Sequence, residues 1–341
     1  MPADVQACRV AIAGASSLRG KELKLLLEDG NFPAAEVRLL DEDIAVGTLT
    51  EAGGEPAVIQ AVDHESFERV RFAFFAGAAA FAARHWETAE QAGATVIDLS
   101  GGLAGVPSAR RWIPALDALL PPPPAQTSPQ AGGRLFLSPS APAIVACSLA
   151  AALAGFEVER LALVFFQPVS ERGPAGIEEL ESQTVKLLAL QPIGQEVFDA
   201  QVAFNLLDRY GEASDARLAD ARSSIVQEIR SYLEGRAPVP AIQLIQAPVF
   251  YSYAFTAYAE LGAQPELAEL GRALEAAGAR LAGAGDAAPS NVSVAGESRL
   301  VLSQIEADPN VGRGYWLWGA ADNLRLGAAN AIRIAETLLA S

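Results

Sequence analysis

The sequence predicts a two-domain protein of the α/β class, and three observations support this prediction. The chain has 341 residues, which is about two domains at roughly 100–200 residues per domain. Short β-rich runs alternate with helical patterns early in the chain, which is typical of a doubly wound parallel sheet. Further along, the strands and helices become longer, which favours a second domain of α+β type.

The first domain is predicted from its elements in chain order. A β-rich run at residues 9–13 ends at Gly14, and a helical pattern follows at residues 21–28. Further strands are expected at residues 37–40, 72–75, 95–99 and 135–137, with a helix at residues 78–92. Strands that alternate with helices form a parallel sheet with right-handed crossovers, so we expect a Rossmann-type domain of the nucleotide-binding kind.

The second domain is expected from residue 138 to residue 321, with strands and helices of greater length. A loop rich in Pro, Gln, Gly and Ser at residues 121–133 precedes it. The last helix, at residues 323–339, should pack back on the first domain. The first domain therefore comprises residues 1–137 together with residues 322–341.

Composition and net charge exclude some classes of structure and partner. Hydrophobic residues make up 51% of the chain and charged residues 19%, which supplies a sizeable core and argues against disorder. Acidic residues outnumber basic ones by 41 to 25, so the formal net charge is −16. An acidic surface repels phosphate backbones and anionic lipids, and we therefore expect no nucleic-acid partner and no membrane partner.

The cysteines and the apolar runs indicate the compartment. Two cysteines, Cys8 and Cys147, are too few for a disulfide scaffold and fit a reducing cytoplasm. The N-terminus has no signal-peptide pattern. Residues 135–156 lack charge, but Pro139 and Pro142 interrupt them, which favours a strand, a turn and a buried helix over a membrane span. We predict a cytoplasmic protein without a metal site.

A glycine turn between the first strand and the first helix is the candidate cofactor site. It runs from Gly14 through Ser16, Ser17, Leu18 and Arg19, where a dinucleotide pyrophosphate would meet helix N–H groups. Ser17 replaces the middle glycine of such turns, so the backbone cannot approach a pyrophosphate as closely. Two interpretations stay open: a cofactor site, or a tight turn that serves only the fold.

Several segments, taken in order, resemble the aspartate-semialdehyde dehydrogenase family. They are residues 10–20, 74–77, 96–100, 138–141, 166–176, 203–205, 246–249 and 318–329. Together they extend over nearly the whole chain, and their order is more specific than any one of them. N-acetylglutamyl-phosphate reductases share the architecture, so the resemblance identifies the superfamily before the subfamily.

The resemblance implies a reaction and the groups that perform it. The family reduces an acyl phosphate to an aldehyde with NADPH, using a cysteine thiolate and a histidine base. By resemblance, Ala141 occupies the cysteine position, Gln246 that of a substrate-binding arginine and Tyr253 that of the histidine. A methyl group cannot be acylated, and a tyrosine with a pKa of about 10 is a poor base at neutral pH. Cys147 is expected to be a small buried side chain instead.

Other family positions keep polar residues. Gln167 matches an active-site glutamine and Glu228 a substrate-binding glutamate, and we favour structural hydrogen bonding as the role of both. The family's phosphate-binding arginine would fall near Ala104, with Arg110 and Arg111 close by in the sequence.

The segment that would bind the cofactor implied by the resemblance is acidic. The family binds the 2′-phosphate of NADP after the second strand, where this chain has Asp41, Glu42 and Asp43. Carboxylates repel a 2′-phosphate, whereas Asp41 is able to hold the ribose hydroxyls of NAD. No cofactor is therefore certain: NADP is not expected, and weak NAD binding stays open.

We interpret the chain as a catalytically inactive homologue of aspartate-semialdehyde dehydrogenase, similar to the Usg-type proteins of Gram-negative bacteria, with a binding or assembly role. The alternative is an NAD-dependent oxidoreductase that acts on an aldehyde or acyl phosphate of amino-acid biosynthesis. The resemblance also implies a homodimer formed through the second domain. Apolar strands expected at residues 161–166 and 249–255, the second aromatic on both faces, offer a surface for it.

Overall fold

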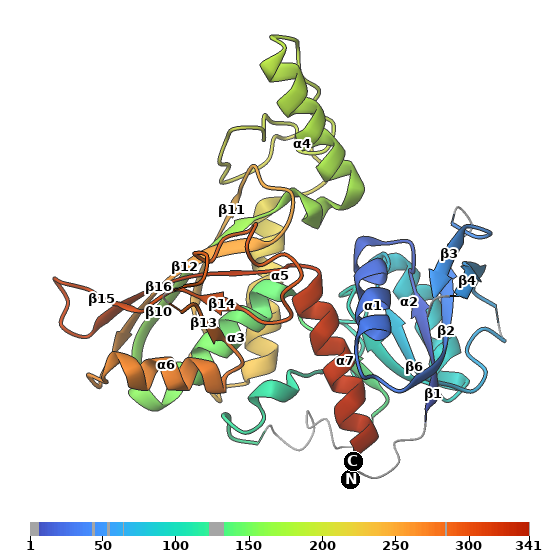
Figure 1. Cartoon of the computed structure of the whole chain (residues 1–341), viewed down its shortest axis with the longest axis horizontal. Helices are drawn as coiled ribbons and strands as arrows, with labels where there is room; N and C mark the ends of the chain where they lie inside the picture. The colour runs from blue at the N-terminus through green and yellow to red at the C-terminus, as the bar shows by residue number, and fades with distance from the viewer. Residues whose placement is uncertain are drawn as a thin grey trace. The chain divides into compact units, whose positions relative to one another are not determined.

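The computed structural model describes residues 7–42, 45–52, 55–63, 65–122, 133–283 and 285–340. The chain divides into two compact units. The first comprises Met1–Pro114, Pro122–Pro139 and Gly327–Ser341, and the second comprises Ala115–Pro121 and Ser140–Leu326. The predicted α/β class is confirmed, because one unit holds a parallel sheet and the other a mixed sheet (Figure 1).

The first unit is a doubly wound parallel sheet with the strand order β5-β2-β1-β6-β7-β9-β8. Its strands are β1 (Cys8–Ala13), β2 (Ala34–Asp41), β5 (Gln60–Ala61), β6 (Val70–Phe75), β7 (Thr95–Asp98), β8 (Arg110–Arg111) and β9 (Leu135–Leu137). A hairpin of β3 (Leu49–Ala52) and β4 (Glu55–Val58) comes between β2 and β5 in the chain. The strand order reverses between β1 and β6, which is where folds of this kind place their ligands.

Helices cover both faces of the first sheet. They are α1 (Leu18–Asp29), α2 (Ala79–Gln91) and α7 (Arg325–Ala340). Leu23 of α1 and Ile334 of α7 pack in one layer of the core, and Phe81 of α2 packs in the other. Asn330 of α7 donates to the Trp112 carbonyl at 2.9 Å, which ties the helix to the sheet. The last helix thus packs in the core of the first unit, and the domain bounds expected from the sequence stay a prediction.

The second unit is built on a mixed sheet with the strand order β11-β10-β12-β16-β14-β13, and β15 pairs with β16. Its strands are β10 (Val158–Gln167), β11 (Ala241–Gln246), β12 (Tyr253–Leu261), β13 (Arg280–Leu281), β14 (Val301–Leu302), β15 (Glu306–Ala307) and β16 (Gly314–Ala321). β10 and β11 are parallel, whereas β12 is antiparallel to both β10 and β16. The long central strands agree with the pattern expected for the second domain.

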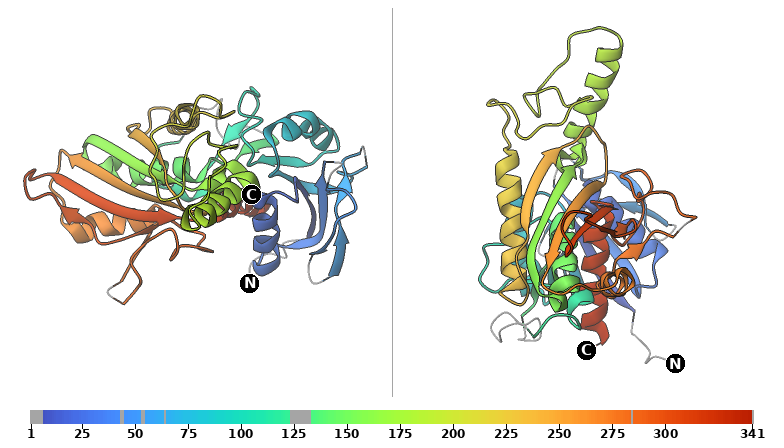
Figure 2. Two further views of the ribbon diagram at one scale, coloured as in Figure 1. Left: turned by 90° about the horizontal axis from the view of Figure 1, so that it is seen from above. Right: turned by 90° about the vertical axis from the view of Figure 1, so that its left-hand side faces the viewer.

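Three helices pack together on this sheet. They are α3 (Ala141–Leu153), α5 (Leu218–Leu233) and α6 (Leu267–Ala276). Every residue of α3 is buried, and the helix contacts β10, α5 and α6, while α5 runs alongside β11 (Figure 2). The charge-free residues 135–156 thus form a strand, a turn and a buried helix, as predicted. In the described part of the chain, no helix is long and apolar enough to cross a membrane.

The opposite face of the second sheet, called the open face below, carries aromatic side chains. Trp316 and Trp318 of β16 are 43% and 40% exposed. Their rings lie 4.8 Å from the Tyr258 ring and 6.3 Å from the Phe166 ring, respectively. Buried and half-exposed residues alternate along β12, as expected of a strand with one covered face.

The strand predicted at residues 249–255 begins later than expected. Residues 247–252 form a loop, and β12 starts at Tyr253. Ser252 has a φ of 67°, a left-handed conformation that a strand cannot contain. The prediction of a strand aromatic on both faces at residues 249–255 is wrong, because only residues 253–255 of this run belong to β12, and Tyr253 and Phe255 both lie on its buried face.

An arm extends from the end of this sheet (Figure 1). It consists of α4 (Gly173–Leu188) and residues 189–217. Gln183 of α4 is fully buried, and its side chain donates to two backbone carbonyls and accepts the N–H groups of Val202 and Ala203. One side chain thus fastens an irregular segment to the helix.

Candidate functional site

The turn between β1 and α1 requires glycine at one position. Gly14 has a φ of 90°, and a Cβ there would lie 2.2 Å from the backbone nitrogen of Gly77. Ser17 caps α1, since its Oγ accepts the Gly20 N–H and donates to the Ala76 carbonyl, both at 2.9 Å. The tight turn is present, and Ser17 already occupies one of the helix N–H groups that a phosphate would use.

An acid at the end of β2 lies against this turn. Asp41 is 9% exposed and accepts the N–H groups of Ser16 at 2.7 Å and Glu42 at 2.8 Å. Arg19, the second residue of α1, donates to the Leu99 carbonyl at 2.9 Å. The structure thus brings the predicted glycine turn and Asp41 together, while the Arg19 side chain forms its hydrogen bond with the loop after β7.

A cavity of about 390 Å³ opens beside Asp41. Its lining residues are Asp41, Glu42, Ala61, Val62, Phe81, Arg84 and His85. Glu42 forms an ion pair with Arg84, and the His85 ring lies 4.8 Å from the Phe81 ring. Burial and the nearby Arg84 charge hold the pKa of His85 below its usual range, so the ring is neutral at neutral pH. Asp43 and His64 lie outside the described residues.

A buried acid organises the loop after β7. Asp98 is 1% exposed and accepts the N–H and O–H groups of Ser100 and the N–H group of Leu103 at 2.6–3.1 Å. Burial raises the pKa of this carboxyl. Arg110, one of the arginines considered for a phosphate, donates to the Pro107 carbonyl of its own loop at 2.9 Å. Asp98 lies in the resemblance segment at residues 96–100, but the sequence predicts no role for it, because a lone acid at the end of a strand carries no motif.

The N-terminus of α3 is capped by a carboxylate from another helix. Ser140 precedes Ala141, and its N–H and O–H groups donate to Glu228 of α5 at 2.9 and 2.6 Å. Ala141 is 3% exposed and Cys147 is fully buried. Burial, with a smaller effect from the Glu228 charge, raises the pKa of the Cys147 thiol well above its usual range. Cys147 therefore lacks the exposure and the low pKa that a reactive cysteine needs.

Strand ends bring three of the predicted site residues together. Gln167 ends β10 and Gln246 ends β11, and the parallel register places the two residues side by side. Tyr253 begins β12, which runs antiparallel to β10 from the same edge. Tyr210 joins them from the arm, because Leu207 forms an isolated bridge to Gln246. We call Gln167, Tyr210, Gln246 and Tyr253 the polar cluster.

The polar cluster is closed on itself. Gln167 Nε2 donates to the Tyr210 hydroxyl at 2.9 Å and to Gln246 Oε1 at 3.2 Å, and the Tyr210 hydroxyl donates to Gln246 Oε1 at 2.7 Å. Gln246 Nε2 donates to the carbonyls of Gln167 and Ala247 at 2.9 and 3.0 Å, and the Tyr253 hydroxyl donates to Gln167 Oε1 at 3.3 Å. Every side-chain donor hydrogen of the cluster therefore has an acceptor within the unit.

The polar cluster is largely buried and contains no ionic group. Gln167, Gln246 and Tyr253 are at most 4% exposed. Burial raises the pKa of Tyr210, so its hydroxyl remains a donor at neutral pH. None of the four side chains carries a positive charge, and such a cluster offers no cation to a carboxylate or a phosphate.

Comparison with known proteins identifies the family. The profile described as "Semialdehyde dehydrogenase, NAD binding domain" matches residues 9–118, and that described as "Semialdehyde dehydrogenase, dimerisation domain" matches residues 149–326. The chain belongs to the semialdehyde dehydrogenase family. The first profile contains the glycine turn and Asp41, and the second contains the polar cluster and the arm.

Relatives within the semialdehyde dehydrogenase family match over nearly their full length. A protein named USG-1 protein homolog from Pseudomonas aeruginosa is 32% identical over 98% of both chains. Aspartate-semialdehyde dehydrogenase 2 from Vibrio cholerae is 26% identical over 98% of both chains. A solved structure described as a probable aspartate-semialdehyde dehydrogenase from Pseudomonas aeruginosa has a TM-score of 0.86 and 30% identity, with 98% of each chain covered.

Proposed function

We propose that this chain is a catalytically inactive member of the semialdehyde dehydrogenase family that acts through binding and assembly. The polar cluster is the observation that supports this proposal most. By the sequence resemblance, Gln246 and Tyr253 stand at the positions of the substrate-binding arginine and the base. Both side chains are neutral, buried and fully hydrogen-bonded within the unit, so neither is free to bind a carboxylate or move a proton.

The nucleophile position supports the same proposal. The family reaction needs a thiolate at a helix N-terminus, and Ala141 stands there by resemblance. Cys147 lies in the same helix but is fully buried, and its raised pKa disfavours the thiolate. Glu228 places its carboxylate on Ser140 at the start of this helix, which makes the N-terminus less favourable for a second anion.

The test is an activity assay with aspartate semialdehyde, phosphate and either NADP or NAD, on protein made in a host that lacks its own enzyme of this type. We expect no phosphate-dependent turnover. Ala141→Cys alone should not create activity, because catalytic groups act as a unit. Turnover by the unchanged protein that persists through purification would overturn the proposal.

The same proposal includes a prediction of which dinucleotide the first unit binds. The first unit is an NAD binding domain by family, and Asp41 sits against its glycine turn. A buried carboxylate there repels a 2′-phosphate, whereas it accepts a hydrogen bond from a ribose hydroxyl. We expect no NADP binding at micromolar concentration by calorimetry and weak NAD binding at most. Low micromolar affinity for NADP would exclude this part of the proposal.

An alternative function is an NAD-dependent oxidoreductase that uses other residues. The cavity beside Asp41 supports it, because the His85–Phe81 ring pair and an acid suit a nucleoside with a free ribose. NADH oxidation in the presence of a panel of aldehydes and acyl phosphates separates the two functions. Turnover that Asp41→Ala abolishes would favour the alternative, whereas NAD binding without turnover favours the inactive homologue.

The assembly role requires a second copy. We propose a homodimer, in the cytoplasm, that forms through the open face of the second unit. Trp316 and Trp318 are partly exposed there, and their indole N–H groups donate to Asp308 Oδ2 and to the Pro289 carbonyl, both at 2.8 Å. Held in this way, the rings form an ordered apolar surface of the kind found in isologous interfaces.

A further inference from the structure

Two strands of the first unit pair at one end and separate toward the other. β5 pairs with β2 only at Leu40 and Asp41. One residue, Ile59, separates β5 from β4, and β4 pairs with β3 instead. Figure 1 shows this hairpin next to β2. In the described part of the chain, the outer edge of β2 therefore has no partner strand over residues 36–39.

A cavity of about 440 Å³ lies between the separated strands. It is lined by residues 36–39 of β2, by Ala57 and Val58 of β4, and by side chains from the segment at residues 60–68. The volume lies in the range of about 300–1,000 Å³ that is usual for ligand sites. A strand paired on one side presents N–H and C=O groups along its other edge, where they form a template for a further strand.

A side chain, rather than a backbone pair, joins β2 to the segment that follows β5. Arg38 Nη1 donates to the carbonyls of Glu65 and Ser66, both at 2.9 Å. Arg38 Nε donates to Glu36 Oε1 at 3.1 Å. The segment is thus attached to β2 without using the backbone groups along the outer edge of this strand.

The two sides of the cavity differ in chemistry. Val37 and Ala57 pack against the same core layer of the first unit, so one side is apolar. Side chains alternate across a strand, and Arg38 therefore lies on the opposite side, with the segment to which it is bonded. The acids of the lining belong to β2 and to this segment, and they are Glu36, Asp63, Glu65 and Glu68.

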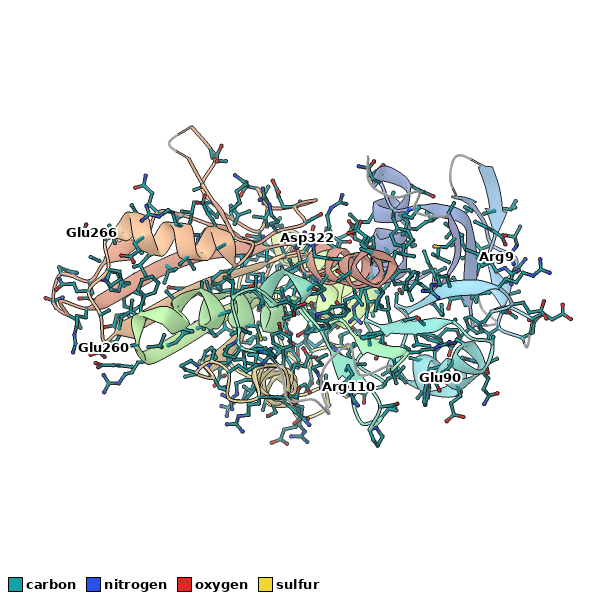
Figure 3. All side chains as sticks on the ribbon, turned by 90° about the horizontal axis from the view of Figure 1, so that it is seen from below. Arg9, Glu90, Arg110, Glu260, Glu266 and Asp322 are labelled. Carbon is teal, nitrogen blue, oxygen red and sulfur yellow. The ribbon has the colours of Figure 1, made fainter. Side chains whose placement is uncertain are left out.

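The charge of the cavity is negative. Four carboxylates line it against one guanidinium, that of Arg38. Arg9 also pairs with Glu36, at 2.6 Å, and Figure 3 shows Arg9 at the outer side of the first unit. The carboxylates still outnumber the guanidinium groups when Arg9 is counted. Such a potential attracts a basic ligand and repels an acidic one.

We propose that this cavity binds an extended peptide segment of a partner protein in which basic and apolar residues alternate. The backbone of the segment pairs with the outer edge of β2, as in other cases of strand addition. Its apolar side chains lie beside Val37 and Ala57, and its basic side chains lie beside Glu65 and Glu68. The inference concerns the first unit alone, and it rests neither on the homodimer nor on the absence of turnover.

Matched peptides test the backbone pairing and the charge preference. The probe is a capped five-residue peptide of alternating lysine and valine, and calorimetry at low salt measures its dissociation constant. A peptide with glutamate in place of lysine should bind at least about tenfold more weakly. A peptide with methylated backbone nitrogens keeps the side chains and the charge but cannot donate to a strand edge, and it should also bind at least about tenfold more weakly.

A charge reversal in the protein locates the site. Glu65→Lys/Glu68→Lys should raise the dissociation constant of the lysine–valine peptide at least about tenfold. Glu87→Lys/Glu90→Lys, on α2 of the same unit, is the matched control, because it changes the net charge equally at a distance from the cavity lining. It should raise the dissociation constant less than about threefold. Circular dichroism of each variant establishes that the fold is retained.

Hydrogen exchange gives a second measurement on the unchanged protein. The peptide should slow exchange at residues 36–39 and leave β8, at the other end of the same sheet, unaffected. Equal affinity for the methylated peptide, or for the protein with reversed charge at positions 65 and 68, would overturn the proposal. The absence of binding would also overturn it, and the carboxylates would then serve only to keep other strands away from the edge of β2.

Discussion

At the scale of single residues, Ser252 has two features that lower the free energy of unfolding. Its φ of 67° is left-handed, and its buried Oγ has no hydrogen-bond partner in the described part of the chain. The backbone stays in this conformation because the Ser252 N–H donates to Asn323 Oδ1 at 2.9 Å. Glycine adopts such a φ without steric cost and carries no hydroxyl.

Ser252→Gly is therefore expected to raise the free energy of unfolding by about 1 kcal/mol, after allowing for the entropy that glycine adds to the unfolded chain. Urea denaturation followed by circular dichroism measures the change. Ser252→Ala is the matched control, because it removes the unpartnered hydroxyl but keeps the strained backbone, and it should gain less. A glycine variant less stable than the original protein would contradict this interpretation of Ser252.

The polar cluster gives a second residue-scale prediction. Tyr210→Phe removes a hydroxyl that donates to Gln246 and accepts from Gln167, and it leaves both buried amides short of a partner. We expect the free energy of unfolding to fall by about 1–3 kcal/mol. Tyr251→Phe, at a position 40% exposed, should change it by less than about 0.5 kcal/mol. Equal effects of the two substitutions would mean that the cluster does not stabilise the unit.

The sequence predicts three residues of the polar cluster but not the fourth, Tyr210. Gln167 and Gln246 end neighbouring strands, and a motif match selects them together with Tyr253. Tyr210 lies in the irregular part of the arm, where no periodicity or spacing relates it to the other three. Only the bridge between Leu207 and Gln246 brings it into place, and one isolated bridge leaves no sequence pattern.

At the scale of elements, strong patterns were predictable and short or irregular segments were not. The charge-free residues 135–156 gave β9 and the buried helix α3, because a run without charge between strand and turn signals has few other solutions. The β3–β4 hairpin and the two-residue strand β8 carry too few residues for a periodic signal. The start of β12 was missed because Ser252 turns the backbone inside an apolar run, and nothing in the residue types marks that turn.

The arm is the element whose integrity depends on the fewest groups. Gln183→Leu removes four hydrogen bonds that hold the segment around residues 194–203 to α4. We expect local opening to become easier by about 1–3 kcal/mol, so that limited proteolysis cuts the arm at least about tenfold faster. Gln191→Leu, at an exposed position just after α4, should leave the cleavage rate unchanged. Unchanged cleavage in the Gln183 variant would mean that other contacts hold the arm.

At the scale of the whole molecule, sequence and structure agree on a retained fold. The family relationship extends over nearly the whole chain, and the parallel and mixed sheets follow from it. Selection for assembly alone would keep such a fold, because an interface needs the sheet and its covering helices but no thiolate or base. The catalytic inactivity that we propose and the exposed, ordered aromatic side chains then have one explanation.

That explanation predicts how the molecule responds to dilution. Of the four tryptophans, Trp316 and Trp318 are the two on the open face, and both are about two-fifths exposed in the single chain. A dimer of obligate type buries on the order of 2,000 Å² or more, which would cover these rings. Fluorescence emission should therefore shift to longer wavelength as the protein is diluted from micromolar to nanomolar concentration, in step with the loss of the dimer by light scattering.

Trp318→Arg should give the shifted spectrum and the monomer mass at every concentration, whereas the matched variant Leu25→Arg, at an exposed position of the first unit, should behave as the unchanged protein. A dimer that persists in the Trp318 variant would place the interface elsewhere, and assembly would then no longer explain why the sheet keeps an aromatic face.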